Sequence, residues 1–402
     1  MALEQANAGV ARSDAASIVA RRRRNRVKYQ ATQLAIVVVA IALVLLLGML
    51  VNSGLAQRGI NFTFTFLWNS AGFDISEGKT VVFDQSIGPR LTDFTADLNL
   101  AQAFVAGLFN TLKVAILGIV LSTVLGTLFG VGRLSTNWVV RNLCFWVVEF
   151  VRNTPLLIQI VFWYFAVVLQ FPAIASAAKF YGVIISQQGL YLPTLTWQGA
   201  GDAVALVLLT ACVVAIVGTI FDRGRARWLC CAVAVVVFAL MLGKGTIAVD
   251  FPMASKFKAS GGTSISPEMA ALLLGIVFNS ASYIAEIVRG AIDTLPKGQW
   301  EAAAALGLSR RDIVNDIILP QVFRVVLPSF GNQYISLTKN TALGIAIGYP
   351  DLFNIYGTVA NQTGHSLEGI IIVMLAYLVI SWIISAIVGA IDHRLNAVGA
   401  AR

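Results

Sequence analysis

Charged side chains recur at helical spacing inside long apolar stretches of this chain. Glu149 and Arg152 are three residues apart, and so are Glu286 and Arg289, so each pair lies on one face of a helix. Charges inside a bilayer are costly and commonly mark a path for a polar solute. They also occur as local ion pairs whose long side chains reach the membrane surface. The spacing leaves both interpretations open.

Uncharged polar side chains accompany one of these charges. Asn279, Ser282, Tyr283 and Glu286 are separated by three or four residues and therefore share one side of a helix. Such a side can line a path for a polar solute. We predict that it lines a path.

Two further polar patches interrupt apolar stretches. Thr154 and Pro155 predict a helix start, because proline is favoured at the first helical position. If the stretch is broken there, its exposed N–H groups can face an anion, although a simple bend is the more ordinary outcome. Lys339, Asn340 and Thr341 lie about halfway along a later stretch.

The sequence lacks the residue patterns of bond-making chemistry. Its only histidines are His365 and His393, and it contains neither Gly-x-Ser-x-Gly nor Cys-x-x-Cys. The Gly-Lys-Thr at residues 78–80 lacks the glycine that a phosphate-binding loop needs five positions earlier. We therefore predict no catalytic residue, no metal site and no cofactor bound by this chain, which excludes an enzyme.

The composition places the chain in a membrane. Hydrophobic residues make up 57% of its 402 residues and charged residues only 12%, with a mean hydropathy of +0.79. Soluble domains contain about 25% charged residues. The net charge of +9 comes from basic residues between apolar stretches, which argues against nucleic acid and for contact with membrane lipid. We predict an all-α polytopic membrane protein with about eight transmembrane helices.

The predicted layout begins with a cytoplasmic tail at residues 1–31, a first transmembrane helix at 32–51 and a periplasmic loop at 52–100. The other spans are predicted at 112–131, 144–169, 203–221, 228–243, 270–289, 328–347 and 369–391. An inserted segment, 171–266, contains the two-helix hairpin of the fourth and fifth spans. Gly126 and Gly130 permit close contact with another helix, unless their spacing is chance in a glycine-rich chain.

The basic residues orient this layout. Of the 29 lysines and arginines, 19 fall in segments that the layout makes cytoplasmic and eight in external segments. Cytoplasmic loops of membrane proteins are enriched in such residues. We therefore predict that both termini are cytoplasmic.

The longest polar segment between two apolar ones in the second half is EAAAALGLSRRDIVNDIILP, Glu301 to Pro320. It predicts two short helices joined by Gly307 in the left-handed conformation. Ser309 and Asp312 form a capping box for the second helix, and Pro320 is expected to end it.

The alanines of this segment predict a contact surface. Small side chains at Ala302 and Ala303 would let the backbone of another protein approach, although an amphipathic connector on the membrane surface has a similar pattern. With its flanks, residues 295–328, the segment resembles the EAA loop of bacterial ABC importer permeases. Thr-Pro-Leu-Leu at residues 154–157 matches a second motif of the polar amino-acid permeases, the histidine/glutamine type.

This resemblance covers residues 107–394 and implies a function. It implies a permease domain at residues 101–394, with a type I ABC importer core, in the bacterial inner membrane. Such a permease of the polar or general L-amino-acid type pairs with a second homologous permease. It also works with an ABC ATPase dimer that holds ATP and magnesium, and with a periplasmic amino-acid-binding protein. An ion-coupled secondary transporter is the alternative, but it would usually show matched inverted halves, and we find no such repeat.

The resemblance also assigns roles to residues. It implies that coupling to the ATPase involves Glu301, Ala302, Ala303, Gly307, Ser309 and Asp312. The predicted substrate path comprises Asn279, Ser282, Tyr283, Glu286, Thr154, Asn340 and Thr341. Glu286 would meet the ammonium group of the amino acid. Ala342 stands where the family often has serine, which weakens the assignment at Thr341.

Overall fold

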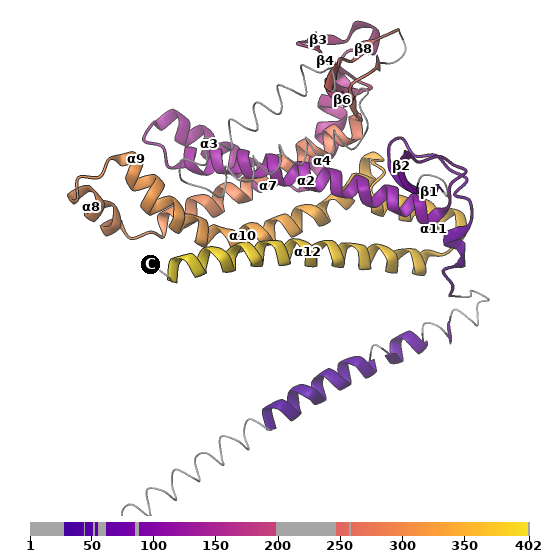
Figure 1. Ribbon diagram of the computed structural model, residues 1–402, viewed down its shortest axis with the longest axis horizontal. Coiled ribbons are helices and arrows are strands. Elements are labelled where there is room, and N and C mark those ends of the chain that lie inside the picture. Colours follow the sequence, from indigo (N-terminus) through magenta and orange to yellow (C-terminus); the bar gives the residue numbers. More distant parts are fainter. Residues whose placement is uncertain are drawn as a thin grey trace, which may run out of the picture. The chain divides into compact units, whose positions relative to one another are not determined.

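The structure, a computed structural model, describes residues 28–43, 45–50, 53–54, 62–84, 88–197, 247–256 and 259–400 (Figure 1). The chain forms two compact units, Met1–Thr65 and Phe66–Arg402. The first unit contains a helix, Lys28–Leu50, that is long and apolar enough to cross a membrane. It overlaps the first predicted span, residues 32–51. The predicted hairpin of the fourth and fifth spans lies outside the described residues.

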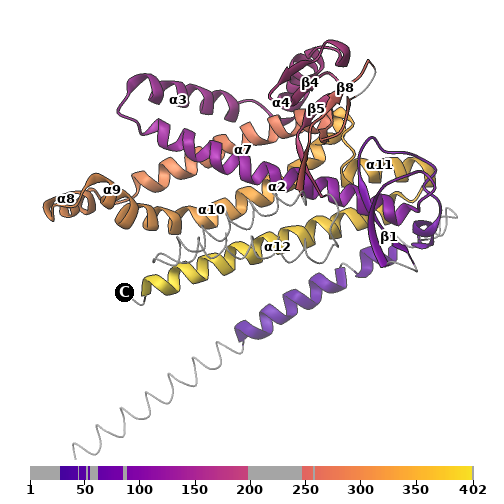
Figure 2. The ribbon, with the colours of Figure 1, turned by 45° about the horizontal axis from the view of Figure 1, so that its top comes forward.

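Two long helices of the second unit, α2 (Leu100–Arg133) and α7 (Pro267–Asp293), pack side by side (Figures 1 and 2). A Cβ atom added at Gly126 would lie 2.7 Å from the backbone oxygen of Ala281, and Gly130 is packed almost as closely. The close helix contact that the spacing of these glycines permits is therefore present. Helices in lipid depend on such packing because lipid chains are as apolar as the helices themselves.

Two further helices, α10 (Leu319–Asn340) and α12 (Ser366–Ala400), also lie alongside each other (Figure 2). Gly331 permits this contact, since a Cβ there would lie 2.9 Å from Cγ1 of Val388. A 3₁₀ turn, Thr341–Ile347, continues α10. Among the described residues five helices are long and apolar enough to cross a membrane, and one bent helix pair makes a sixth candidate. The mostly helical, multi-span class is therefore confirmed.

The bent pair corresponds to the predicted third span. α3 (Trp138–Arg152) and the helical stretch Leu156–Gln170, which begins with α4 (Leu156–Phe162), meet at 104°. Pro155 precedes α4 with φ −59° and ψ 134°, and this extended ψ interrupts the helix. The break lies where Thr154 and Pro155 predicted a helix start, but the simple bend that we expected is wrong.

A short helix, α11 (Leu352–Thr363), was not predicted. Asp351 caps it by accepting a hydrogen bond of 2.8 Å from the backbone N–H of Asn354, and it accepts a second one of 3.3 Å from the Tyr377 hydroxyl. The Asp351 side chain is fully buried. Burial raises the pKa of its carboxyl to about 6, because desolvation disfavours the charged form. With 12 residues α11 is too short for a span, so the search for long apolar stretches missed it.

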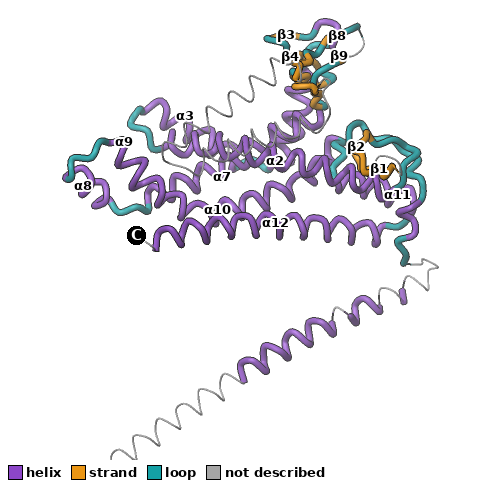
Figure 3. The backbone as a smooth tube through the Cα atoms, in the orientation of Figure 1, coloured by secondary structure: helices purple, strands orange, loops and turns teal. Residues whose placement is uncertain are grey.

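Short antiparallel strands lie outside the spans (Figure 3). One hairpin consists of β1 (Lys79–Asp84) and β2 (Gly88–Asp93). A four-stranded sheet has the order β10 (Thr263–Ile265), β5 (Gly189–Leu192), β4 (Val183–Ser186) and β3 (Ala178–Phe180). The remaining pairs are β6 (Thr194–Trp197) with β7 (Ile247–Asp250) and β8 (Met253–Ala254) with β9 (Ala259–Ser260). We predicted these segments only as external stretches, without strands.

Candidate functional site

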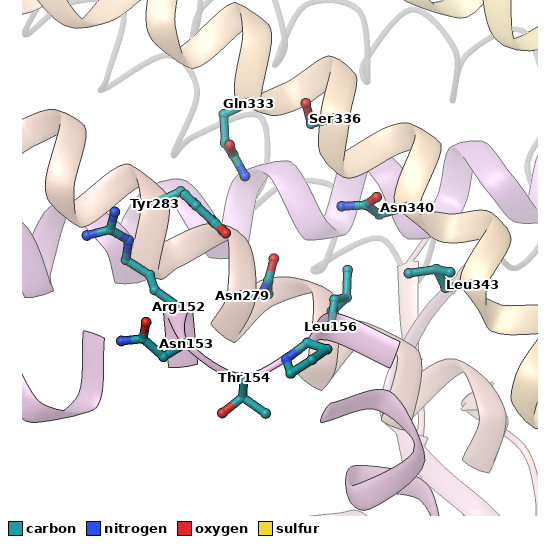
Figure 4. A pocket seen from close by; sticks show the side chains of 11 residues that line it. Arg152, Asn153, Thr154, Leu156, Asn279, Tyr283, Gln333, Ser336, Asn340 and Leu343 are labelled. Carbon is teal, nitrogen blue, oxygen red and sulfur yellow. The ribbon is translucent and has the colours of Figure 1, made fainter. Parts of the chain in front are cut away.

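A polar cavity of about 610 Å³ opens beside the break between α3 and α4 (Figure 4). Its walls come from the break itself, from α7, from α10 and from the 3₁₀ turn that follows α10. The lining residues are Arg152, Asn153, Thr154, Pro155, Leu156, Asn279, Tyr283, Gln333, Ser336, Asn340 and Leu343. Non-helical backbone at membrane depth is tolerated where it lines a cavity. The cavity therefore accounts for the helix break at this position.

The structure brings together four of the seven residues predicted to line the substrate path: Asn279, Tyr283, Thr154 and Asn340. The other three, Ser282, Glu286 and Thr341, do not line this cavity. Ser282 is buried and donates a hydrogen bond of 2.6 Å to the backbone oxygen of Asn279. Thr341 is buried, donates to the Thr338 oxygen at 2.8 Å and lies 3.3 Å from the Tyr377 hydroxyl.

Sequence reasoning missed two polar residues that α10 contributes. Gln333, Ser336 and Asn340 are spaced by three and four residues, so they share one face of α10. Figure 4 shows Gln333 and Asn279 pointing toward the space between α10 and α7. The same spacing test that selected Asn279 and Tyr283 would have found this face, had it been applied upstream of Asn340.

Glu286 was predicted to bind the substrate ammonium group, but in the structure its carboxylate is bound by Arg133. Its Nη1 donates a hydrogen bond of 2.6 Å to Oε2 of Glu286, and Arg289 donates another to Oε1. Arg152 lies 3.6 Å from the same carboxylate. Three guanidinium groups thus surround Glu286, which leaves it poorly placed to meet a substrate ammonium group.

The two local ion pairs predicted from sequence are part of one larger cluster. Arg133 Nη2 lies 3.6 Å from Glu149, which lies 3.9 Å from Arg152. The side chain of Arg133 is only 8% exposed, so these pairs hold a largely buried guanidinium where α2, α3 and α7 meet. Removing one partner of such a pair is costly because it leaves a buried charge uncompensated. The cluster stabilises the junction of the three helices.

Arg152 belongs to both the cluster and the cavity. Its distances to Glu149 and Glu286, 3.9 and 3.6 Å, exceed hydrogen-bonding distance. Within the described part of the chain its buried Nε has no hydrogen-bond partner. The guanidinium carbon lies 5.6 Å from the ring centre of Tyr283, a cation–π distance. Because Nη1 makes only these two long ion pairs among the described residues, the guanidinium group keeps hydrogen-bonding capacity at the edge of the cavity.

Gln159 on α4 holds the corner of the break. Its buried side-chain amide donates two hydrogen bonds of 2.8 Å, one to the backbone oxygen of Val151 and one to that of Thr154. Both oxygens lie at the end of α3 or just beyond it, where a helix leaves carbonyls without partners. The Val151 oxygen also accepts from the backbone N–H of Thr154 at 3.3 Å. The Gln159 side chain thus links two carbonyls and positions the backbone next to Arg152.

The predicted coupling segment forms a helical hairpin. α8 (Lys297–Ala305) ends before Gly307, whose φ of 76° is left-handed as expected. Ser309 caps α9 (Arg310–Asp312), accepting from the Asp312 N–H at 3.3 Å and donating to the Asp312 carboxylate at 2.6 Å. Glu301, Ala302 and Gly307 are exposed.

Two expectations about this segment are wrong. Ala303 is only 3% exposed and packs with Ile313 and Ile318 of the same chain, so it offers no surface to a partner. Pro320 does not end the helix. A π-helical turn, Ile313–Ile318, precedes it and runs directly into α10, and such turns accommodate local distortions of the helical hydrogen-bond pattern.

Comparison with known proteins assigns the family. Residues 118–397 match the family model of the binding-protein-dependent transport system inner membrane component. The chain belongs to this family. It is 34% identical, over 86% of each chain, to the general L-amino acid transport system permease protein AapQ of Rhizobium johnstonii. It is 35% identical to the putative amino-acid ABC transporter permease protein YhdX of Escherichia coli, over 86% of this chain and 88% of YhdX.

A third relative carries a narrower name. The glutamate/glutamine/aspartate/asparagine transport system permease protein BztB of Rhodobacter capsulatus is 32% identical, over 92% of this chain and 94% of its own. The matched family region of our permease includes every residue that lines the cavity and the whole coupling segment. Because the relatives are named as transport permeases, the prediction that the chain is not an enzyme is confirmed.

The corner held by Gln159 gives a first test of the cavity. We expect Gln159→Glu to weaken the permease, because a carboxylate cannot donate to the two carbonyls of residues 151 and 154 and repels them. An unsatisfied buried carbonyl costs about 1–3 kcal/mol. The Thr154 oxygen would lose the bond that it accepts from Gln159, whereas the Val151 oxygen would keep the one from the Thr154 N–H. The melting temperature of the purified permease and its transport rate should both fall. Gln170 also donates to a backbone oxygen, that of Phe165 at 3.1 Å, but at an exposed position where water can replace the bond, so Gln170→Glu should leave both near wild type. Equal effects of the two substitutions would contradict this role for Gln159.

Proposed function

We propose that this chain is the permease subunit of an ATP-driven importer that moves L-amino acids across the bacterial inner membrane. The observation that carries the proposal is the polar cavity at a broken span with the donors of Arg152 at its edge. AapQ is named for L-amino acids in general, and BztB for two acidic amino acids and their amides. All of these substrates share an α-carboxylate, for which an arginine is a suitable partner.

Recognition of the substrate would start at its carboxylate. A guanidinium group can hold a carboxylate through two parallel hydrogen bonds, which orients the ligand as well as binding it. The amide groups of Asn279, Gln333 and Asn340 would meet the ammonium group and polar side chains of the substrate. This assignment replaces the earlier expectation for Glu286, whose carboxylate is engaged by arginines.

Coupling to ATP hydrolysis would run through the hairpin of residues 295–328. Its exposed Glu301, Ala302 and Gly307 form the surface on which an ABC ATPase dimer, with its ATP and magnesium, would dock, while Ser309 and Asp312 hold the second helix in place. The second helix continues into α10, which lines the cavity. A displacement of the hairpin would therefore move one cavity wall. A second homologous permease and a periplasmic amino-acid-binding protein would complete the complex.

The proposal predicts ATP-dependent uptake. The permease, purified with its co-purifying subunits and reconstituted in proteoliposomes, should accumulate radiolabelled L-glutamine or L-glutamate only when ATP is supplied on the side of the coupling segment. Uptake should require the binding protein and persist when ion gradients are dissipated by ionophores. Uptake that needs an ion gradient and ignores ATP would instead identify a secondary transporter.

The proposed orientation places both termini and the coupling segment in the cytoplasm. The distribution of lysine and arginine supports it. Alkaline phosphatase is active only outside the cytoplasm, so a fusion after Gly189 should be active and a fusion after Arg311 inactive. Activity after Arg311 would put the coupling segment on the wrong side for an ATPase.

A further inference from the structure

A second cavity, of about 760 Å³, lies at the other end of α2 from Arg133. Its walls are the start of β1, the end of β2, the α2 turn at Asn110 and Lys113, and the turn that enters β10. Among the described residues it shares no lining residue with the cavity at Arg152. Its size lies within the range of pockets that bind small molecules, about 300–1,000 Å³.

Glu77 is one of the charged residues that line this cavity. Its side chain is 17% exposed, and its carboxylate has three partners in the chain: Lys113 Nζ lies 3.4 Å from Oε2, Ser266 Oγ donates to Oε1 at 3.2 Å, and the Tyr349 hydroxyl donates a further hydrogen bond. The backbone is held as well, because Asn110 donates a hydrogen bond of 2.8 Å to the carbonyl oxygen of Glu77. The charged group is thus fixed in position while part of it stays open to the cavity.

A second pair of opposite charges faces the same space. Lys79 and Asp93 are directly opposite each other in the β1–β2 hairpin, and both line the cavity. The lining therefore carries two carboxylates and two ammonium groups. Phe94 and Phe109 add apolar wall.

This arrangement restricts the ligand. An anion such as phosphate would meet two carboxylates, and a purely apolar ligand would desolvate four charges without compensating them. Within the described chain no group of three or more acidic, histidine or cysteine side chains is arranged for a metal ion. A small molecule with one positive and one negative group satisfies both signs of charge.

We propose that this second cavity binds a free amino acid as a zwitterion, with its ammonium group against Glu77 and its carboxylate against Lys113. The identity of the ligand class rests on the proposed function, but the site does not coincide with the cavity at Arg152. The exposed Ser264 lines the rim and reports on occupancy.

The test is protection of a thiol placed at that rim. Ser264→Cys is introduced into the full permease complex in lipid nanodiscs, where both faces are accessible. The rate at which the cysteine reacts with a bulky maleimide is then measured with and without L-glutamine or L-glutamate. At ten times the amino-acid concentration that gives half-maximal protection, we expect labelling to be about ten-fold slower than without the amino acid. Ser176→Cys, the same change at an exposed position outside the cavity, should react at an unchanged rate, and the unsubstituted chain gives the background of native cysteines.

Second variants locate the protection. It should be lost with Lys113→Gln and with Glu77→Gln, retained with Lys179→Gln on the exposed strand β3, and retained with Arg152→Gln. Acetate and methylammonium, which each carry one of the two charges, should protect weakly. The proposal would be overturned if protection survived both cavity substitutions. It would also be overturned if an amino acid that the complex transports gave no protection. In either case the proposed function would stand. If the complex transported no amino acid in the uptake assay, both the proposed function and the proposal for the second cavity would be wrong.

Discussion

Replacing Arg152 by glutamine should lower amino-acid uptake by about 10- to 100-fold, the value of one strong hydrogen-bonded charge. The guanidinium lies at the edge of the polar cavity, beyond hydrogen-bonding distance from Glu149 and Glu286. Its loss would remove the partner of the substrate carboxylate. Arg152→Lys should recover part of the uptake, because an ammonium group keeps the charge but not the two parallel donors. The measurement is the initial rate and half-saturation in proteoliposomes.

Two matched substitutions separate binding from the charge cluster. Arg141→Gln removes a positive charge from an exposed position on the same helix and should leave uptake unchanged. Arg289→Gln removes a cluster arginine that does not line the cavity, so it should reduce stability more than it changes half-saturation. If Arg289→Gln raised half-saturation as much as Arg152→Gln, the cluster and not the cavity would carry the effect.

Aspartate at Ala302 or Gly307 should uncouple the permease from ATP hydrolysis. Both positions are exposed on the coupling hairpin, and an unpaired charge placed against a docked ATPase must be desolvated at considerable cost. At Gly307 the φ of 76° adds strain of about 1–2 kcal/mol for a residue with a Cβ atom. The loaded binding protein should then no longer raise ATP hydrolysis above its basal rate, or the ATPase should be lost from the purified complex.

Ala303 needs a different interpretation from Ala302. Because it is buried against the hairpin's own apolar residues, Ala303→Asp should destabilise the hairpin even without a partner, and it cannot report docking alone. Lys297→Ala, at the exposed start of α8, should leave stimulation near wild type. Full coupling in both Ala302→Asp and Gly307→Asp would reduce the hairpin to a surface connector.

Local patterns predicted the parts of this permease whose structure depends on neighbours in sequence. The long apolar stretches predicted the candidate spans that the described residues contain, because a bilayer requires about 20 such residues whatever they pack against. Gly307 and Ser309 predicted the turn and the cap of the coupling hairpin, since both depend on one residue's conformation and on a bond to a residue three positions away. Pro320 misled us because its effect depends on the π-helical turn before it.

The sequence by itself determined that this is a multi-span membrane protein with a helical hairpin between two spans, and helical periodicity placed Asn279 and Tyr283 on a common face. Only the tertiary structure decided which polar residues share a cavity. Periodicity defines a face of one helix but not what lies opposite it. Glu286 binds Arg133, which lies 153 residues away in the chain. Arg152 lies next to the 104° break and lines a cavity together with residues of α7 and α10. These contacts join separate helices, so they exist only once the helices have packed.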